Sequence, residues 1–215
     1  MKLYSYFRSS AAYRVRIVLA LKGLEVDYRY IHMLKDGGQQ HSADYDAVNP
    51  LKLVPALEIE GGILTQSLAI CEYLDETHPD PPLLPGNAAD RGYVRAIAAA
   101  IACEIHPLNN LRVLAYLSVE LGLDKPARDV WYRHWIAEGL TGVEALVARS
   151  GKAGDFCFGD TPTLADAFLV PQLANARRFA CDLAAYPTLT AIEQRAVRLP
   201  AFAAAAPEAQ GDAEH

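Results

Sequence analysis

The sequence contains no apolar run that approaches the roughly 20 residues a helix needs to cross a bilayer. Its first residues lack the basic-then-apolar pattern of a signal peptide. The four cysteines include no C-x-x-C pair, and the six histidines show no metal-ligand spacing, which disfavours disulfides and a metal site. A net charge of −6 leaves no basic footprint for nucleic acid or an anionic membrane. We therefore expect a cytoplasmic protein with buried free thiols and no metal, nucleic-acid or membrane partner.

The first organised feature is a strand that leads directly into a helix. Residues 3–7 are rich in aromatic side chains, which favours a strand, and residues 15–21 are apolar nearly all round, which indicates a buried helix. Ser9 and Ser10 lie at the junction, and either can be the N-cap of the helix. The helix N-terminus offers free N–H groups and the positive end of the helix dipole, so an anion or a thiolate is stabilised at this place.

The rest of the N-terminal part predicts a small α/β layer. Residues 26–31 alternate in polarity as a half-buried strand does, and the strand–helix–strand spacing indicates two parallel strands. Two further strands, at 55–60 and 63–65, are expected to pair antiparallel across the turn Gly61-Gly62. Ser67 then fits the N-cap of another helix. The order β-α-β-α-β-β-α is expected within residues 1–78.

A second domain of different composition follows. Residues 79–86 are dense in proline and predict a linker, and residues 87–207 are rich in alanine and leucine with helical periodicity. Thr163 and Asp166 have the spacing of a capping box. The polar tail over 208–215 is predicted to be disordered. The helices are expected near residues 88–121, 127–150, 164–181 and 188–198.

Several motifs occur in an order that resembles the zeta class of the glutathione transferases, over nearly the whole chain. They are Phe-Arg-Ser-Ser-x-x-Tyr-Arg-Val-Arg-Ile from residue 7, Asp-Gly-Gly-Gln-Gln from 36, Asn-Pro-x-x-x-Val-Pro from 49, Gln-Ser-Leu-Ala-Ile from 66 and Leu-Val-Pro-Gln from 169. The resemblance implies a glutathione transferase fold, in which a thioredoxin-like α/β domain precedes an all-α domain. It also implies glutathione as cofactor and a homodimer.

The resemblance also implies where glutathione binds. The serine beside the helix N-terminus hydrogen-bonds the glutathione sulfur, and Ser10 is the first choice for it, followed by Ser9. In the family, a cis Val-Pro peptide offers the valine backbone to the cysteinyl group, which corresponds here to Val54. The other glutathione contacts implied are Gln66 and Ser67 for the γ-glutamyl end, His41 and Lys52 for the glycyl end, and His106 and Asn110 from the helical domain.

On the substrate side, the resemblance implies contacts to a dicarboxylate-like anion. Arg8 and Arg178 correspond to the arginines that contact its carboxylates in the family, and guanidinium forks suit carboxylates. His106 and Arg112 are expected to line the same cleft from the helical domain. The chain departs from the animal members at Ala11, where they commonly carry cysteine, so a serine has to suffice with glutathione as the nucleophile.

The activity implied is a glutathione-dependent cis–trans isomerisation of maleylacetoacetate to fumarylacetoacetate, as in tyrosine catabolism. The alternatives are the same isomerisation of maleylpyruvate and a general transferase or dehalogenase that consumes glutathione, for example on α-haloacids. A non-catalytic binding module of the same fold is a further alternative, and it is disfavoured because a scaffold needs no cation at Arg8 beside the serines.

Overall fold

The computed structural model describes residues 1–214, and the chain divides into two compact units. One unit is formed by Met1–Leu83 together with the residues from Arg198 onward, and the other by Leu84–Val197. The first division, between Leu83 and Leu84, lies inside the linker predicted over 79–86. The second differs from prediction, because the helical unit ends at Val197 and not at residue 207.

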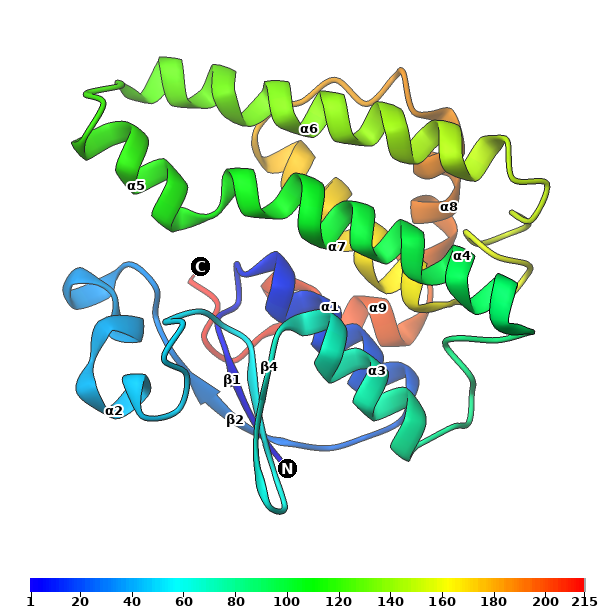
Figure 1. Cartoon of the computed structure of the whole chain (residues 1–215), viewed down its shortest axis with the longest axis horizontal. Coiled ribbons are helices and arrows are strands. Elements are labelled where there is room, and N and C mark those ends of the chain that lie inside the picture. The colour runs from blue at the N-terminus through cyan, green and yellow to red at the C-terminus, as the bar shows by residue number, and fades with distance from the viewer. Residues whose placement is uncertain (215) are drawn as a thin grey trace. The chain divides into compact units, whose positions relative to one another are not determined.

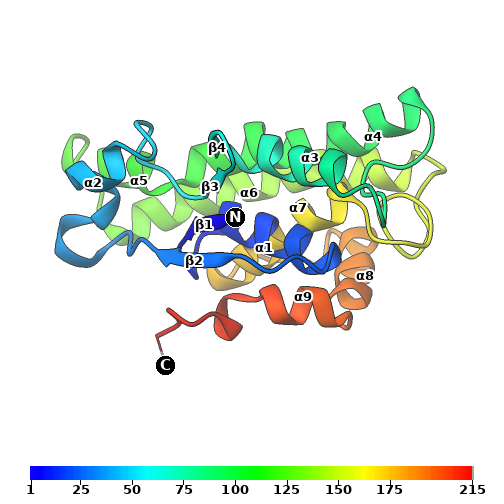
Figure 2. The same ribbon diagram turned by 90° about the horizontal axis from the view of Figure 1, so that it is seen from below.

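The N-terminal unit has the predicted order of strands and helices (Figures 1 and 2). Strand β1 pairs in parallel with β2 and antiparallel with β3, in a mixed sheet of order β2-β1-β3-β4. The prediction of a βαβ unit followed by a hairpin is therefore confirmed. The elements are β1 (Lys2–Ser5), α1 (Ser10–Leu21), β2 (Asp27–Tyr30), η1 (Lys35–Gly37), η2 (Gln39–His41), α2 (Ala43–Asp46), β3 (Ala56–Ile59), β4 (Gly62–Thr65) and α3 (Ser67–Thr77).

Helix α1 is the centre of this unit. Every residue from Ala11 to Leu19 is buried, and α1 packs against α3 and α9, as the apolar pattern predicts. The helix ends at Leu21 with Lys22 as its C-cap, and Gly23 follows with φ +64°, a left-handed conformation that glycine adopts without strain. The hairpin turn differs from prediction by one residue, because Ile59 pairs with Gly62 and the turn residues are Glu60 and Gly61.

The end of the chain returns to the N-terminal unit. Helix α9 (Pro200–Ala205) lies beside α1 (Figure 2), and the 3₁₀ turn η5 (Pro207–Ala209) follows it. Phe202 is fully buried and the Arg16 Nε donates to the Ala205 carbonyl oxygen at 2.9 Å. The predicted disordered tail over 208–215 is thus wrong as far as Glu214, because burial of α9 holds the start of the segment and the carboxylates of Asp212 and Glu214 bind the N-terminal unit.

The second unit is helical. The helix predicted over 88–121 is wrong in its middle, where α4 passes through a π-helical turn and a 3₁₀ turn before α5 begins. Pro107 has no N–H for a continuing helix, and Asn110 starts a new one by accepting a hydrogen bond from Val113 N at 3.2 Å. The elements are α4 (Ala88–Ala99), η3 (Ala100–Ile105), η4 (His106–Asn109), α5 (Leu111–Val119), α6 (Lys125–Ala148), α7 (Leu164–Arg178) and α8 (Pro187–Ala196).

The capping box predicted at the start of α7 is confirmed. The carboxylate of Asp166 is fully buried and accepts hydrogen bonds from Thr163 N at 2.7 Å, Thr163 Oγ1 at 2.8 Å and Cys157 N at 2.8 Å. Burial raises the pKa of Asp166, and these donors oppose that rise. The box therefore fixes the loop before α7 as well as the helix itself.

Surface properties of the helical unit depart from one sequence expectation. Cys71 of the other unit and Cys157 are buried free thiols as expected, whereas Cys181 is half-buried and Cys103 is exposed.

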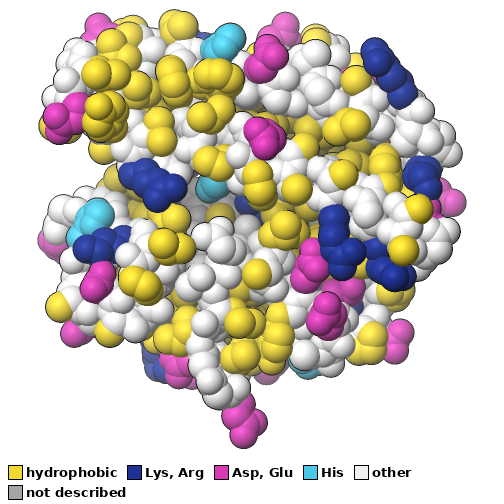
Figure 3. Space-filling model, in the orientation of Figure 1, with side chains coloured by type: hydrophobic (Ala, Val, Ile, Leu, Met, Phe, Trp, Pro, Cys, Tyr) yellow, Lys and Arg dark blue, Asp and Glu magenta, His cyan; other side chains and the backbone are white. Residues whose placement is uncertain are grey.

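Hydrophobic side chains gather where α5 meets α6 (Figure 3). Within residues 1–214, no helix has the length and apolar character needed to cross a membrane. The exposed large apolar residues of α5, of the first turns of α6 and of their connection are Leu111, Tyr116, Val119, Leu121 and Val130.

Candidate active site

The junction of β1 and α1 gives the two candidate serines different roles. Ser9 has extended backbone angles, φ −71° and ψ 114°, and its hydroxyl accepts a hydrogen bond from Ala12 N at 3.2 Å. Ser9 is therefore the N-cap, and Ser10 is the first residue of α1. Among residues 1–214, no group hydrogen-bonds the half-buried Ser10 hydroxyl, so this hydroxyl is available to a ligand at the helix N-terminus.

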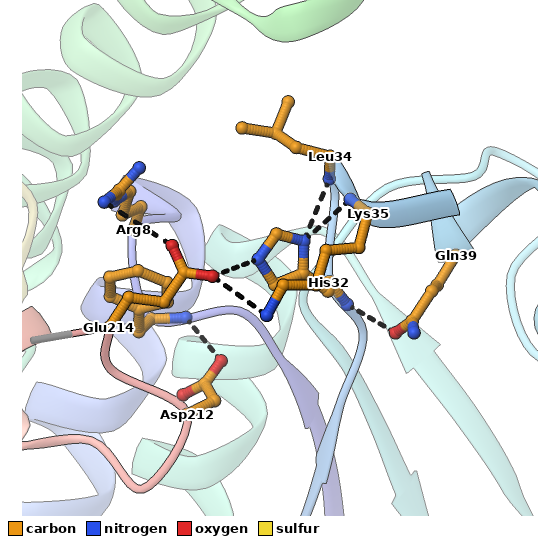
Figure 4. Close-up of polar contacts among 8 residues, drawn as sticks. Arg8, His32, Leu34, Lys35, Gln39, Asp212 and Glu214 are labelled. Carbon is orange, nitrogen blue, oxygen red and sulfur yellow. Dashed lines mark hydrogen bonds and ion pairs between the residues drawn. The ribbon is translucent and has the colours of Figure 1, made fainter. Parts of the chain in front are cut away.

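Two neighbours of the serines complete this loop. Arg8 is exposed, and its guanidinium carbon lies 4.9 Å from the centroid of the Phe7 ring. Its Nη2 atom is 3.8 Å from Glu214 Oε2 (Figure 4). Ala11, the residue after Ser10, is buried with a methyl side chain. The loop thus presents a hydroxyl and a cation, and no protein thiol at this position.

The N-terminus of α3 is a second place with open backbone donors. Gln66, and not the predicted Ser67, is the N-cap, and its side chain makes no capping hydrogen bond. Gln66 has φ +70°, a strained conformation for a residue other than glycine, of the kind found at ligand sites. Ser67 is buried and accepts a hydrogen bond from Arg14 Nη1 at 3.2 Å. The first N–H groups of α3 therefore remain open to an anion.

The remaining candidates of the N-terminal unit lie before β3. The peptide bond between Val54 and Pro55 is cis, and Val54 is buried. Lys52 is exposed with φ +57°, and its Nζ lies 3.5 Å from Asp46 Oδ1. His41 ends η2 and is exposed. These three residues supply a buried backbone segment and two exposed polar side chains.

The candidates of the helical unit fall into two places. His106, Asn110 and Arg112 lie in and after the break between η3 and α5, where Asn110 caps α5 and Arg112 is exposed in its first turn. Arg178 is the last residue of α7 and is exposed. Asn110 is thus bound at its Oδ1 atom by the helix, which leaves its amide N–H₂ as the donor for a ligand.

Tyr132 of α6 ties these two places to one another. Its carbonyl oxygen accepts a hydrogen bond from Asn109 Nδ2 at 3.2 Å, and its hydroxyl accepts one from Asn175 Nδ2 at 2.7 Å. Its ring stacks on Phe179 at 3.5 Å, and Asn175 Oδ1 accepts a hydrogen bond from Arg178 Nη2 at 3.1 Å. Burial raises the pKa of Tyr132, so its hydroxyl stays protonated. The direction of the Arg178 guanidinium is therefore set by fixed neighbours.

In the N-terminal unit, the structure links four of the predicted residues to one another through α1. Arg8, Ser9 and Ser10 are consecutive, and Ser67 is joined to α1 through Arg14, which sequence reasoning passed over. Arg16 was passed over as well, and it donates to the carbonyl oxygen of Phe7 at 3.1 Å. The sequence feature that could have identified Arg14 and Arg16 is their position inside an otherwise apolar helix, where a charged side chain must find buried acceptors.

Comparisons with known proteins place both units in one family. Residues 1–76 match the model of the glutathione S-transferase N-terminal domain, and residues 129–207 match that of the C-terminal domain. A probable maleylacetoacetate isomerase of Vibrio cholerae is 50% identical over 98% of this chain and 97% of that protein. A maleylpyruvate isomerase of a Ralstonia species is 47% identical over 99% of both chains. A crystal structure of maleylacetoacetate isomerase from Methylobacterium extorquens with bound malonate and glutathione is 38% identical, covers both chains fully and superposes with a TM-score of 0.96.

Proposed function

This chain belongs to the zeta class of the glutathione transferases, the family of the maleylacetoacetate and maleylpyruvate isomerases, and on that premise we propose that it converts maleylacetoacetate to fumarylacetoacetate with glutathione as cofactor. The observation that carries the proposal is that Ser9 and Ser10 have different roles at the β1–α1 junction. Because Ser9 caps the helix, the Ser10 hydroxyl is left to a ligand, and the Arg8 cation stands two residues before it.

The residues of the N-terminal unit fit glutathione. The open N–H groups at the start of α3 suit the γ-glutamyl carboxylate, which Gln66 and Ser67 would hold. The backbone of Val54 suits the cysteinyl group, and His41 and Lys52 are assigned to the glycyl end. The Methylobacterium relative holds glutathione together with malonate, a dicarboxylate.

Bound glutathione would supply a thiolate that adds to the conjugated cis double bond, which thereby becomes a single bond free to rotate, and that leaves again as the double bond re-forms, so glutathione is regenerated. Ser10 donates its hydroxyl hydrogen to the sulfur, which favours the thiolate of a group whose ordinary pKa is about 8.5. Arg8 and Arg178 bind the carboxylates of the substrate and offset the negative charge that develops on it. We assign His106 to the carbonyl of the substrate, as a hydrogen-bond donor, and Arg112 and Asn110 to the ligands at the helical unit.

A specific observation favours a second candidate, maleylpyruvate. The Ralstonia relative, a maleylpyruvate isomerase, is 47% identical to this chain over almost its whole length. The two substrates carry the same conjugated cis double bond beside a ketone, so the same serine and arginines suffice for either. The length of the keto acid distinguishes them.

The test is glutathione-dependent isomerisation of maleylacetoacetate and maleylpyruvate, measured side by side by ultraviolet absorbance, with total glutathione assayed at the end. We expect turnover with glutathione conserved and a higher kcat/KM for maleylacetoacetate. A higher value for maleylpyruvate would reassign the substrate. Stoichiometric loss of glutathione would favour the transferase alternative, and absence of turnover of both compounds would favour the binding module.

Variants of the two serines test the site itself. Ser10→Ala should lower kcat/KM by about 100-fold or more, because the thiolate loses its donor. Ser9→Ala is the matched control, since it removes the same hydroxyl one residue earlier, and it should retain most of the activity. Equal losses in the two variants would show that the sulfur is not assigned correctly to Ser10.

We propose further that the protein is a homodimer, as the family resemblance implies. The exposed apolar residues where α5 meets α6 support a protein contact surface, because such gatherings are uncommon on monomers. Light scattering coupled to size exclusion should give twice the 23.4 kDa mass of the chain. A mass equal to one chain at micromolar concentration would refute the dimer.

A further inference from the structure

The last described residues of the chain meet the loop that carries the candidate catalytic serines. After η5, Asp212 Oδ2 accepts a hydrogen bond from Phe7 N at 3.0 Å (Figure 4). This bond anchors the C-terminal segment one residue before Arg8. Two residues later, the carboxylate of Glu214 lies among three side chains with positive or donor character. Those side chains are Arg8, His32 and Lys35.

His32 is held as a donor toward this carboxylate. Its Nδ1 atom accepts hydrogen bonds from the backbone N–H groups of Leu34 at 3.2 Å and Lys35 at 2.9 Å. Because Nδ1 is an acceptor, the hydrogen of the neutral ring is on Nε2, which lies 3.1 Å from Glu214 Oε1. His32 N donates to Gln39 Oε1 at 2.8 Å, and the Tyr6 ring packs edge-on at 4.9 Å. The histidine side chain is only 14% exposed, so its direction is set before any ligand arrives.

The two cations complete a cradle for one carboxylate. Lys35 Nζ lies 3.0 Å from Glu214 Oε1, and Arg8 Nη2 lies 3.8 Å from Glu214 Oε2, so both oxygens have a partner (Figure 4). Lys35 and His32 hold the pKa of Glu214 below its ordinary value. The carboxylate is 40% exposed and Arg8 is 44% exposed, so solvent screens the pairs and the occupant can exchange.

We propose that Arg8, His32 and Lys35 form a binding site for a carboxylate of the substrate, and that Glu214 occupies this site until the substrate displaces it. The proposal rests on the proposed function and adds His32, Lys35 and Glu214 to it. Glu214 competes as a tethered ligand, because Asp212 keeps it close to the site even when it is displaced. Its removal should therefore strengthen the binding of a dicarboxylate, and removal of a cradle cation should weaken it.

The experiment measures malonate binding by calorimetry at saturating glutathione and fixed ionic strength, with the full chain. Glu214→Gln should bind malonate about two- to five-fold more tightly than wild type. Glu208→Gln is the matched control, because Glu208 is exposed in the same segment and the charge change is identical. Equal malonate affinities of the Glu214→Gln and Glu208→Gln variants would overturn the proposal. Any change in affinity would then come from the overall charge of the chain and not from release of the site by Glu214.

A second pair of variants tests the cradle from the other side. Lys35→Met should bind malonate about two- to five-fold more weakly, whereas Lys125→Met, which removes an exposed lysine of α6, should leave the affinity unchanged. Weaker glutathione binding by Lys35→Met with unchanged malonate binding would assign the cradle to glutathione and overturn the proposal. Malonate that binds neither wild type nor Glu214→Gln would overturn it too.

Isomerase assays on the same preparations separate this inference from the proposed function. Malonate binding that depends on Glu214, in a chain that isomerises neither substrate, supports the carboxylate site and refutes the isomerase. Isomerisation by the chain, together with a malonate affinity that the Glu214→Gln and Lys35→Met substitutions do not change, supports the isomerase and refutes the carboxylate site. A fall in the KM of Glu214→Gln with kcat retained is the kinetic result we expect when both hold.

Discussion

Replacing Arg16 with methionine removes a buried guanidinium from between the β1–α1 loop and α9. The side chain is 1% exposed. It donates to the carbonyl oxygens of Ala205 at 2.9 Å, Phe7 at 3.1 Å and Tyr6 at 3.3 Å, and to Ser5 Oγ at 3.3 Å. Burial lowers the pKa of Arg16 to about 10, because desolvation disfavours its charge, yet at neutral pH it stays protonated and serves these acceptors.

The expected loss follows from the acceptors left behind. The Tyr6 carbonyl keeps a second donor, Ser9 N at 3.0 Å, but among residues 1–214 the Phe7 and Ala205 carbonyls have no other donor. An orphaned buried acceptor costs about 1–3 kcal/mol, so two cost about 2–6 kcal/mol. Methionine fills much of the volume and needs no desolvation of a charge, which offsets part of this. We expect the free energy of unfolding to fall by about 3 kcal/mol in net.

The assay is urea unfolding followed by far-ultraviolet circular dichroism, with wild type and variants at one protein concentration. Arg29→Met is the matched control, because Arg29 is an exposed arginine of β2, and it should change the free energy of unfolding by no more than about 0.5 kcal/mol. An Arg16→Met variant as stable as Arg29→Met would refute the reasoning. It would mean that the desolvation of the guanidinium cancels everything its hydrogen bonds contribute.

Two other pairs of substitutions have outcomes that the structure determines. Gly139→Ala should lower the free energy of unfolding by about 1–3 kcal/mol, because its Cβ would collide with the Ile105 side chain. Gly142→Ala, in the same helix with open space around it, should raise the free energy of unfolding by up to about 1 kcal/mol. Urea unfolding of both variants tests this, and equal effects would refute the reasoning. Ser9→Ala should cost about 1 kcal/mol as the loss of an N-cap, and Ser10→Ala should cost less than half of that, measured as a shift of the urea midpoint.

The parts of the fold that follow from local chemistry could be predicted from the sequence. The alternation of residues 26–31 depends on neighbours in the chain, and so does the capping box of Thr163 and Asp166. The interruption at Pro107 was missed because the apolar periodicity continues on both sides of it, and periodicity reports burial without reporting whether the backbone stays α-helical. Such breaks are decided by backbone hydrogen bonds that the pattern does not record.

The candidate site was predicted through family resemblance for its residue types and only partly for their local roles. A serine before a helix fits an N-cap, but the residue that caps α3 is Gln66, whose positive φ depends on the surrounding chain and not on its own preference. His32 and Glu214 were missed altogether, because the ends of the chain are usually unpaired and 182 positions separate the two residues. Contacts over such separations leave no spacing to read.

The two buried arginines of α1 explain why one stretch of sequence carries so much of the site. Arg14 and Arg16 are two positions apart, so on a helix with 3.6 residues per turn their side chains leave about 200° apart. Arg14 reaches Ser67 at the start of α3, and Arg16 reaches the Phe7 carbonyl and α9. The helix that begins at Ser10 is thereby bonded to the loop before it and to the open N-terminus of α3. Arg14 and Arg16 are therefore supports of the backbone, in contrast to the exposed Arg8, and α1 sets the position of Ser10 relative to the N-terminus of α3.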